Sequence, residues 1–353
     1  MKYLVYALVL MFGFAIVSVS AYAQPIWLQR VEDESAVVMW ISANKEPESV
    51  VYIDPNGISR KSSSKVNALQ PTIDGDIAVN VHEAELVDLC PGTVYKYRVG
   101  GGSERELTTA KPSAHYRFAF TSNPNSFAPG KAQSAWASIT KARPDFVVIS
   151  GDISSKSTNA NYLQFVARGQ PLLSQVATYT VQGNHDNRDY TTYDSWFNNE
   201  TRDRYSERFY AFDKGPIRFV MINDMAARPD MFPADWFRRA IERAGSKWVA
   251  VVANGNWRRF DYMQQQFALN KSGIDMLLTS GSGNQYIDNG QLIVESGGDQ
   301  YVYHAIDVSL SRIDVTGYNS DGGIRGSTFI VRKALEAKPM PPINVRVEPW
   351  QQQ

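Results

Sequence analysis

The sequence predicts an all-β region followed by a larger α/β region. The first observation is a set of short β-rich runs, separated by turns containing Pro and Gly, between Gln24 and about residue 110. The second is a change after Lys111-Pro112, where buried strands begin to alternate with helical stretches. The third is length, because 353 residues suit two domains better than one. We expect domains at 24–110 and 115–333, and a Pro-rich tail at 334–353.

Residues 1–23 are expected to be an export signal. A positive start at Lys2 precedes a nearly unbroken apolar run from Leu4 to Val19, and the Ala-Tyr-Ala triplet at 21–23 is a small-x-small cleavage site. Cleavage is therefore expected after Ala23. The run is short for a membrane span, and no later stretch is apolar enough to cross a bilayer. These features predict a secreted or periplasmic protein with no membrane span after signal cleavage.

Charge and cysteine content exclude several classes of partner and site. Lys plus Arg and Asp plus Glu are 36 each, so no global field favours nucleic acid, and we expect no nucleic-acid partner. Cys90 is the only cysteine, which excludes an intramolecular disulfide and a cysteine zinc site. Its thiol could pair between exported molecules. We expect instead that Cys90 is a partly buried, small apolar residue.

The first region has one specific strand pattern. A turn at Pro91-Gly92 leads into a strand where Tyr95, Tyr97 and Val99 alternate onto one face. The pattern Leu-x-Pro-Gly-Thr-x-Tyr-x-Tyr-x-Val resembles a fibronectin-III-like sandwich, which implies that Trp40 is a core residue of the opposite sheet. His82 lies on a neighbouring strand without a cluster of partners, so we expect it to be structural.

The second region is predicted to be an α/β layer structure with a polar site where its strands end. An amphipathic helix is expected at 131–141. The expected strands lie at 116–121, 146–150, 176–181, 218–222, 248–252 and 276–279.

Two motifs at strand ends resemble those of the metallophosphoesterases. The block Pro-Asp-Phe-Val-Val-Ile-Ser-Gly-Asp at 144–152 is similar to the second family motif, and Gln-Gly-Asn-His-Asp at 182–186 is similar to the third. The strand pair at 208–222 resembles the segment that follows in purple acid phosphatases. With the preceding sandwich, the resemblance to a purple acid phosphatase covers nearly all of 24–333. It implies a calcineurin-like domain of two β-sheets packed together and flanked by helices.

The family holds two metal ions with carboxylate, Asn and His ligands, which clamp a phosphate and supply a hydroxide. The resemblance implies that Asp152 and Asn184 are retained metal-ligand positions and that His185 is the retained position that contacts the phosphate. The remaining family positions carry other residues: Asn123 for the first Asp, Ser155 for the metal-binding Tyr, Asn254 for the fourth-motif His, and Ser282 and Asn284 for the two fifth-motif His residues.

The histidine count also argues against a dinuclear centre. The chain has four histidines: His82 in the sandwich, His115 in the linker, His185 in the third motif and His304 in a late strand. The family site needs three imidazole ligands. We therefore predict that the Fe or Zn pair is lost.

Two functions are compatible with this site. The first is a non-catalytic pseudophosphatase used for binding or assembly, with no cofactor. The alternative is a phosphoric monoester hydrolase with a mononuclear site, holding one weakly bound Ca²⁺ or Mg²⁺. We favour the first, because one carboxylate with neutral amides binds a divalent ion poorly. Asp152 would then cap a helix start and Asn184 would occupy a turn with a left-handed backbone. An acid–base dyad of His185 with Asp186 is disfavoured because sequence neighbours usually point apart.

The tail contains a second strand-like segment. A Pro-rich break at 338–342 precedes Ile343–Val347, in which apolar and polar residues alternate. Such a segment can add to the sheet edge of another molecule, so we expect a contribution to self-association. Packing onto its own domain is the alternative. The sequence does not indicate a natural ligand or partner.

Overall fold

The computed structural model describes most of the chain between the expected signal and the tail. The described residues are 24–126, 129–186, 190–199, 203–206, 208–223, 232–255, 273–297 and 302–331. The expected signal at 1–23 and the whole expected tail at 334–353 therefore lie outside them. Within those ranges, no helix is long and apolar enough to cross a membrane.

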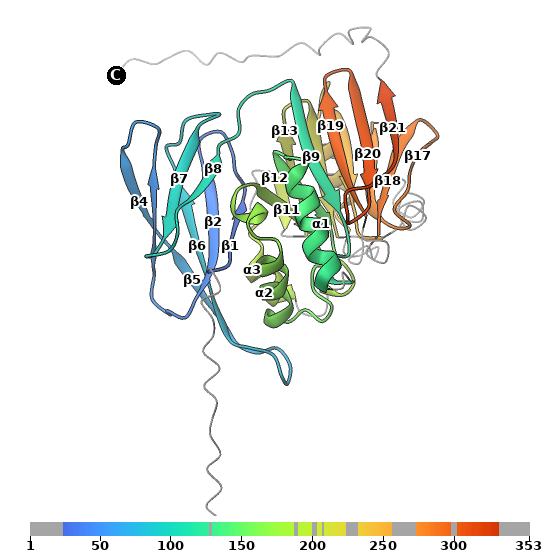
Figure 1. The fold of residues 1–353 in the computed structure, drawn as a ribbon. Helices are drawn as coiled ribbons and strands as arrows, with labels where there is room; N and C mark the ends of the chain where they lie inside the picture. The colour runs from blue at the N-terminus through green and yellow to red at the C-terminus, as the bar shows by residue number, and fades with distance from the viewer. Residues whose placement is uncertain are drawn as a thin grey trace, which may run out of the picture.

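The first region is a β-sandwich (Figure 1). One of its layers contains β4, β3, β7 and β8 in that order, and the other contains β1, β2, β6 and β5. The strands are β1 (Ile26–Gln29), β2 (Ala36–Ser42), β3 (Ser49–Ile53), β4 (Ser59–Ser63), β5 (Lys65–Leu69), β6 (Val79–Leu86), β7 (Val94–Val99) and β8 (Arg105–Thr108).

The predicted alternation in this sandwich is confirmed. Tyr95, Tyr97 and Val99 of β7 are buried while the residues between them are exposed. Trp40 lies in the opposite sheet and is completely buried. Its ring stacks on His82, whose two nitrogens lie within hydrogen-bond distance of the Ser64 hydroxyl and a backbone carbonyl. The role of His82 is therefore structural.

The expectation for Cys90 is wrong, because this residue is exposed. It lies between β6 and β7, immediately before the turn at Pro91-Gly92. The neighbouring Leu89 takes the core position, at 4% exposure, and so Cys90 is left on the outside of the turn.

The second region has the predicted α/β organisation, and the expected strands are present with ends shifted by at most one residue. Its helices are α1 (Pro129–Lys141), α2 (Asn159–Arg168), α3 (Tyr190–Trp196) and α4 (Ala234–Glu242), with short 3-10 turns η1 (Pro124–Ser126) and η2 (Leu172–Ser174). Its strands are β9 (His115–Thr121), β10 (Phe146–Ser150), β11 (Ala177–Val181), β12 (Asp203–Ser206), β13 (Phe209–Lys214), β14 (Ile217–Ile222), β15 (Trp248–Val252), β16 (Met276–Ser280), β17 (Gln285–Asp288), β18 (Gln291–Ser296), β19 (Tyr303–Ser309), β20 (Arg312–Tyr318) and β21 (Ile324–Val331).

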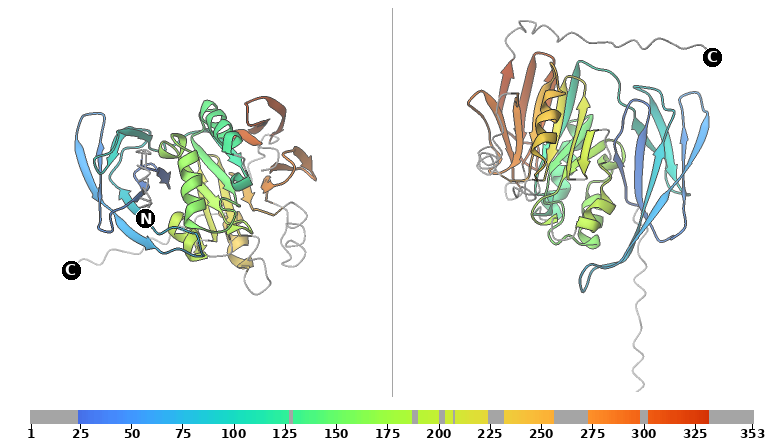
Figure 2. Two further views of the ribbon diagram at one scale, coloured as in Figure 1. Left: turned by 60° about the horizontal axis from the view of Figure 1, so that its bottom comes forward. Right: turned by 180° about the vertical axis from the view of Figure 1, so that it is seen from behind.

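Two sheets pack face to face in this region, as predicted. β10 and β14 meet across the interface, where the rings of Phe146 and Phe219 lie edge to face with centroids 5.6 Å apart. Residues of α1, α2 and α3 cover the outer face of one sheet, and residues of α4 cover the other. The helix α1 lies in front of the strands in Figure 1, and α4 lies in front of them in the rear view of Figure 2.

The two regions share one sheet. Its strand order is β21-β20-β19-β9-β10-β11-β1-β2-β6-β5, and the junction is a parallel pairing of Leu28 in β1 with Ala177 in β11. One hydrophobic core also runs through both regions. The predicted boundary near residue 110 stays a prediction, while the pairing shows that the sandwich is built onto the second region.

Polar contacts reinforce this junction. The Trp27 indole of β1 stacks on Trp196 of α3 and donates to the Trp196 carbonyl at 3.2 Å. The Asp76 carboxylate, from the β5–β6 connection, accepts the N–H groups of Asn159 and Ala160 at the start of α2. Because the first N–H groups of a helix have no partner inside it, Asp76 stabilises α2 from the other region.

Candidate functional site

The ends of three motif strands meet at one edge of the two sheets. Asn254, which follows β15, donates through Nδ2 to the Ser150 carbonyl of β10 at 2.8 Å. The same nitrogen lies 3.4 Å from Oδ1 of Asn123, which follows β9. Because a backbone carbonyl only accepts hydrogen bonds, the contact with Ser150 requires the NH2 group of the Asn254 amide, and not its oxygen, to face Ser150 and Asn123. The structure thus joins the first, second and fourth motif positions through N–H donors.

Asp152 is fixed by backbone geometry. It has a left-handed φ of 53°, is 5% exposed, and accepts the His185 N–H through Oδ1 at 3.0 Å. Burial raises the pKa of the Asp152 carboxyl, and the hydrogen bond from His185 opposes the rise. A Cβ on Gly183 would lie 2.1 Å from Oδ1 of Asp152, so only glycine fits there. Asp152 therefore connects the loops after β10 and β11 through this hydrogen bond.

His185 has a defined tautomer when it is neutral. Its Nδ1 lies 2.9 Å from the Ser155 carbonyl, which can only accept a hydrogen bond. Nδ1 therefore carries the proton, and Nε2 carries the lone pair. The preceding Asn184 is exposed, and its backbone lacks the left-handed φ that the sequence suggested. That conformation occurs at Asn123 and Asp152 instead.

Asp186 is the anchor of the third-motif loop. Its buried carboxyl accepts the N–H groups of Ser154 at 2.8 Å, Gly183 at 3.0 Å and Ile153 at 3.1 Å. The Tyr162 hydroxyl is 3.3 Å from Oδ1. Burial raises the pKa of Asp186 to about 7, although the backbone N–H groups act in the opposite direction. Asp186 and the His185 ring thus bond to different groups and form no dyad.

The fifth-motif positions form a separate cluster around Glu295. The Ser282 hydroxyl donates to Oε2 of Glu295 at 2.9 Å, and Nδ2 of Asn284 donates to the Ser282 hydroxyl at 2.7 Å. Glu295 lies in β18 and is 8% exposed. Sequence reasoning missed this carboxylate. A charged residue within the apolar run of β18 was the signal that would have found it.

The serines at the strand ends donate to backbone carbonyls. The Ser122 hydroxyl donates to the Ser296 carbonyl, the Ser280 hydroxyl to the Asn254 carbonyl, and the Ser296 hydroxyl to the Val302 carbonyl at 2.6 Å. A hydroxyl has one proton, and each of these protons is used within the protein. These hydrogen bonds therefore link the strand ends at this edge to one another.

The residues present do not fit a pair of divalent ions. The described residues contain no group of three or more His, Cys, Asp or Glu side chains placed to hold a metal. Asn254 directs an N–H group at Asn123 Oδ1, where the family needs ligand lone pairs. Two cations about 3.5–4 Å apart need anionic ligands to offset their repulsion, and Asp152 alone is insufficient.

The histidines outside this edge do not complete the site. His82 is buried in the sandwich, and His115 is exposed at the start of β9. His304 of β19 is completely buried, with Nε2 3.1 Å from Oε1 of Gln285. Its Nδ1 has no hydrogen-bond partner in the described part of the chain.

His304 predicts a loss of stability in acid. Burial, together with the nearby Arg325 charge, lowers the pKa of His304 to about 3, whereas an unfolded histidine titrates near pH 6.5. Between these values only the unfolded chain takes up the proton, so the free energy of unfolding falls as pH is lowered, by about 1.4 kcal/mol per unit. Urea denaturation measures the free energy of unfolding at pH 7.5 and at pH 4.5. Between these two values, we expect the free energy of unfolding of His304→Gln to fall by about 2–3 kcal/mol less than that of the wild type. Equal losses would contradict this prediction, and His115→Gln is the matched control.

Comparison with known families agrees with this architecture. Residues 24–141 match the model of the purple acid phosphatase N-terminal domain, and residues 127–281 match the calcineurin-like phosphoesterase model. The fold is thus that of a metallophosphoesterase domain preceded by a β-sandwich. The chain belongs to the calcineurin-like metallophosphoesterases and carries an N-terminal domain of the purple acid phosphatase type.

Several solved structures share part of the fold at low similarity. They include a predicted phosphoesterase from Streptococcus pneumoniae (12% identity, TM-score 0.33) and Vps29 proteins from Cryptosporidium parvum (10%, 0.35) and Entamoeba histolytica (13%, 0.33). Each match covers 62% of this chain and 99% of the other. No curated protein matches the chain.

Proposed function

We propose that this protein is an exported, non-catalytic member of the metallophosphoesterases that uses the fold for binding or assembly. The observation that carries the proposal is the Asn254 amide, which donates to Ser150 and points a hydrogen at Asn123. The resemblance implies that the positions of Asn123 and Asn254 supply metal ligands in the family. An amide N–H has no lone pair for a cation, so these contacts support closure of the site by hydrogen bonds between protein groups.

The chemistry of the remaining groups supports the same conclusion. Asp152 is the one carboxylate among the retained family ligand positions, and its Oδ1 already accepts the His185 N–H. Among the described residues, no cluster of three or more metal-ligating side chains lies beside His185 to generate a hydroxide. Export is supported by the sequence of residues 1–23, and intact mass of the secreted protein tests it by locating the mature start at Gln24.

The test is metal binding and phosphatase activity. Protein purified without chelators is expected to contain less than one-tenth of an ion per chain by elemental analysis. It should not hydrolyse an aryl phosphate from acid to neutral pH with added Fe, Zn, Mn, Mg or Ca. A variant that restores the family ligands is the matched comparison and should gain bound metal. Its substitutions are Asn123→Asp, Asn254→His, Ser282→His and Asn284→His.

One result would reverse the proposal. Metal-dependent turnover that Asp152→Asn abolishes would establish the alternative, a hydrolase with a mononuclear site. Turnover that persists in Asp152→Asn would instead indicate a contaminating enzyme, because Asp152 is the single retained carboxylate of the family set.

A further inference from the structure

A small pocket lies between α1 and α2, which are neighbours on the outer face of their sheet (Figure 1). Its floor is apolar, because the rings of Trp136 in α1 and Phe165 in α2 meet edge to face with centroids 5.7 Å apart. Its rim is polar and includes Asn161, Gln164 and Arg168, which follow one another at helical spacing along α2. The pocket therefore combines a buried aromatic base with a row of polar side chains from one helix.

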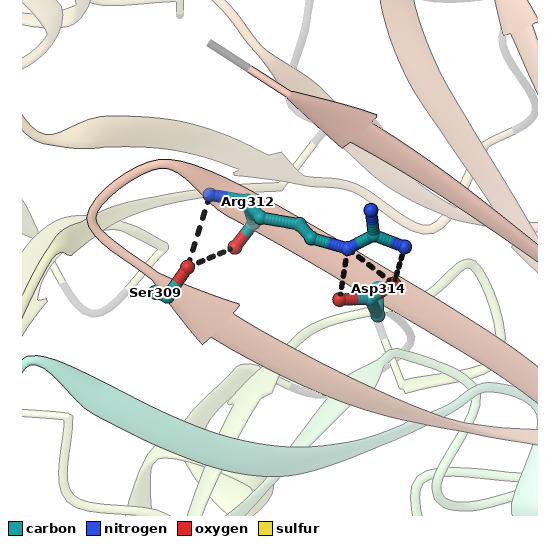
Figure 3. Close-up of polar contacts among 3 residues, drawn as sticks. All are labelled: Ser309, Arg312 and Asp314. Atoms are coloured by element: carbon teal, nitrogen blue, oxygen red, sulfur yellow. Dashed lines mark hydrogen bonds and ion pairs between the residues drawn. The ribbon is translucent and has the colours of Figure 1, made fainter. Parts of the chain in front are cut away.

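Arg168 differs from other buried or partly buried arginines in having no partner. The Arg312 guanidinium bonds to Asp314 on the same strand (Figure 3). Arg218 bonds to Asp213 at 3.1 Å and also donates to a backbone carbonyl. Arg168 is partly buried as well, but its guanidinium has no hydrogen-bond or ion-pair partner among the described residues. Its five N–H donors are left for a ligand.

The electrostatic surroundings of Arg168 favour an anion. Burial lowers the pKa of the Arg168 guanidinium, whereas hydrogen bonds to Asp307 and Asp314 raise the pKa values of Arg117 and Arg312. None of the described residues that line the pocket is an Asp or a Glu. A positive charge that is partly removed from water and has no counter-ion is unfavourable, and an anion in the pocket would offset that cost.

Two amide side chains supply further donors beside the guanidinium. Oδ1 of Asn161 accepts the Ser155 hydroxyl at 3.0 Å, so the NH2 group of Asn161 faces away from Ser155. Neither this NH2 group nor the Gln164 side chain bonds to another described residue. An arginine fork with neighbouring amide N–H groups is a donor set that suits the oxygens of a carboxylate or a phosphate.

We propose that the pocket between α1 and α2 binds a small oxyanion, a carboxylate or phosphate group, through the Arg168 guanidinium and the amide N–H groups of Asn161 and Gln164. The site is separate from the hydrogen-bonded strand ends, and of the motif positions Ser155 alone lines it. The Ser155 hydroxyl bonds to Asn161, and its carbonyl accepts from Nδ1 of His185 at 2.9 Å. Ser155 therefore connects the oxyanion pocket to the third-motif loop.

Titrations with sodium acetate and with inorganic phosphate test the site in the whole protein. At constant ionic strength, two-dimensional NMR should show saturable shifts of the Asn161 and Gln164 side-chain amide signals, with a dissociation constant of roughly 1–10 mM. Tighter binding of acetate would identify a carboxylate as the preferred group, and tighter binding of phosphate would identify a phosphate. The absence of saturable shifts with both anions, or shifts confined to other basic residues, would overturn the proposal.

Substitution of Arg168 provides the second measurement. Arg168→Gln should weaken anion binding by roughly tenfold or more, because the charged hydrogen-bond donor is lost. The matched control, Arg98→Gln, removes the same charge from an exposed position on β7 and should change the affinity by less than about twofold. Equal affinities in the wild type and Arg168→Gln, or equal losses in the two variants, would overturn the proposal.

Arg168→Lys distinguishes ligand binding from a purely structural role. Arg168 lies in the last turn of α2, where a positive charge stabilises a helix without any ligand. Lysine keeps that charge but lacks the planar fork that binds two oxygens. We therefore expect Arg168→Lys to keep the wild-type stability in urea and to bind the anion several-fold more weakly. Wild-type affinity in this variant would overturn the role of the guanidinium.

Discussion

Replacing Asp186 with alanine is expected to destabilise the protein by about 5 kcal/mol, because several buried donors lose their acceptor together. This carboxyl accepts hydrogen bonds from the N–H groups of Ile153, Ser154 and Gly183. The Tyr162 hydroxyl also lies within hydrogen-bond distance of it. An unpaired buried donor costs about 1–3 kcal/mol, and this site would contain three or four. That loss is comparable to the whole stability of many domains.

Asp152→Ala is the matched control for this experiment. Asp152 lies in the same pair of loops and is also buried, but its side chain accepts a single backbone N–H. We expect a loss of about 1–3 kcal/mol for that variant. Urea denaturation followed by circular dichroism measures both free energies of unfolding. If Asp186→Ala were no more destabilising than Asp152→Ala, the carboxyl of Asp186 would not be the anchor of the third-motif loop.

Trp27→Ala is expected to weaken the junction between the two regions and to cost about 3–5 kcal/mol. The Trp27 side chain is 1% exposed and stacks on Trp196 with ring centroids 5.5 Å apart. It belongs to the sandwich, whereas its neighbours Tyr162 and Phe197 in the same cluster belong to the second region. Removing the indole therefore leaves a cavity at the shared surface. In the wild type, fluorescence and circular dichroism should report one common unfolding transition.

Trp236→Ala is the control that distinguishes a weakened junction from a general loss of stability. Trp236 is 6% exposed and packs between α4 and its own sheet, away from the sandwich. Limited proteolysis near residues 110–115 should be several-fold faster in Trp27→Ala than in Trp236→Ala under conditions where the two are equally stable. Equal cleavage rates, or two separate transitions in the wild type, would show that the regions fold independently.

Much of the secondary structure, and both family motifs, could be predicted from the local sequence. Period-two alternation identified the strand of Tyr95, Tyr97 and Val99, and continuous apolar runs identified β10 and β15. These signals are local because they reflect which face of a strand meets the core. The same reasoning placed the motif residues at strand ends, where parallel strands bring polar groups to one edge.

Local sequence was enough to predict the order of the two regions, the positions of the central strands and the two family motifs. The fold itself was needed to show that β1 continues the sheet of the second region, that Asn254 donates to Ser150, and that Glu295 accepts from Ser282. Each of these contacts joins residues far apart in the chain or on different strands, and local periodicity carries no information about such pairings. Cys90 shows the same limit, because its exposure depended on which neighbour took the core position.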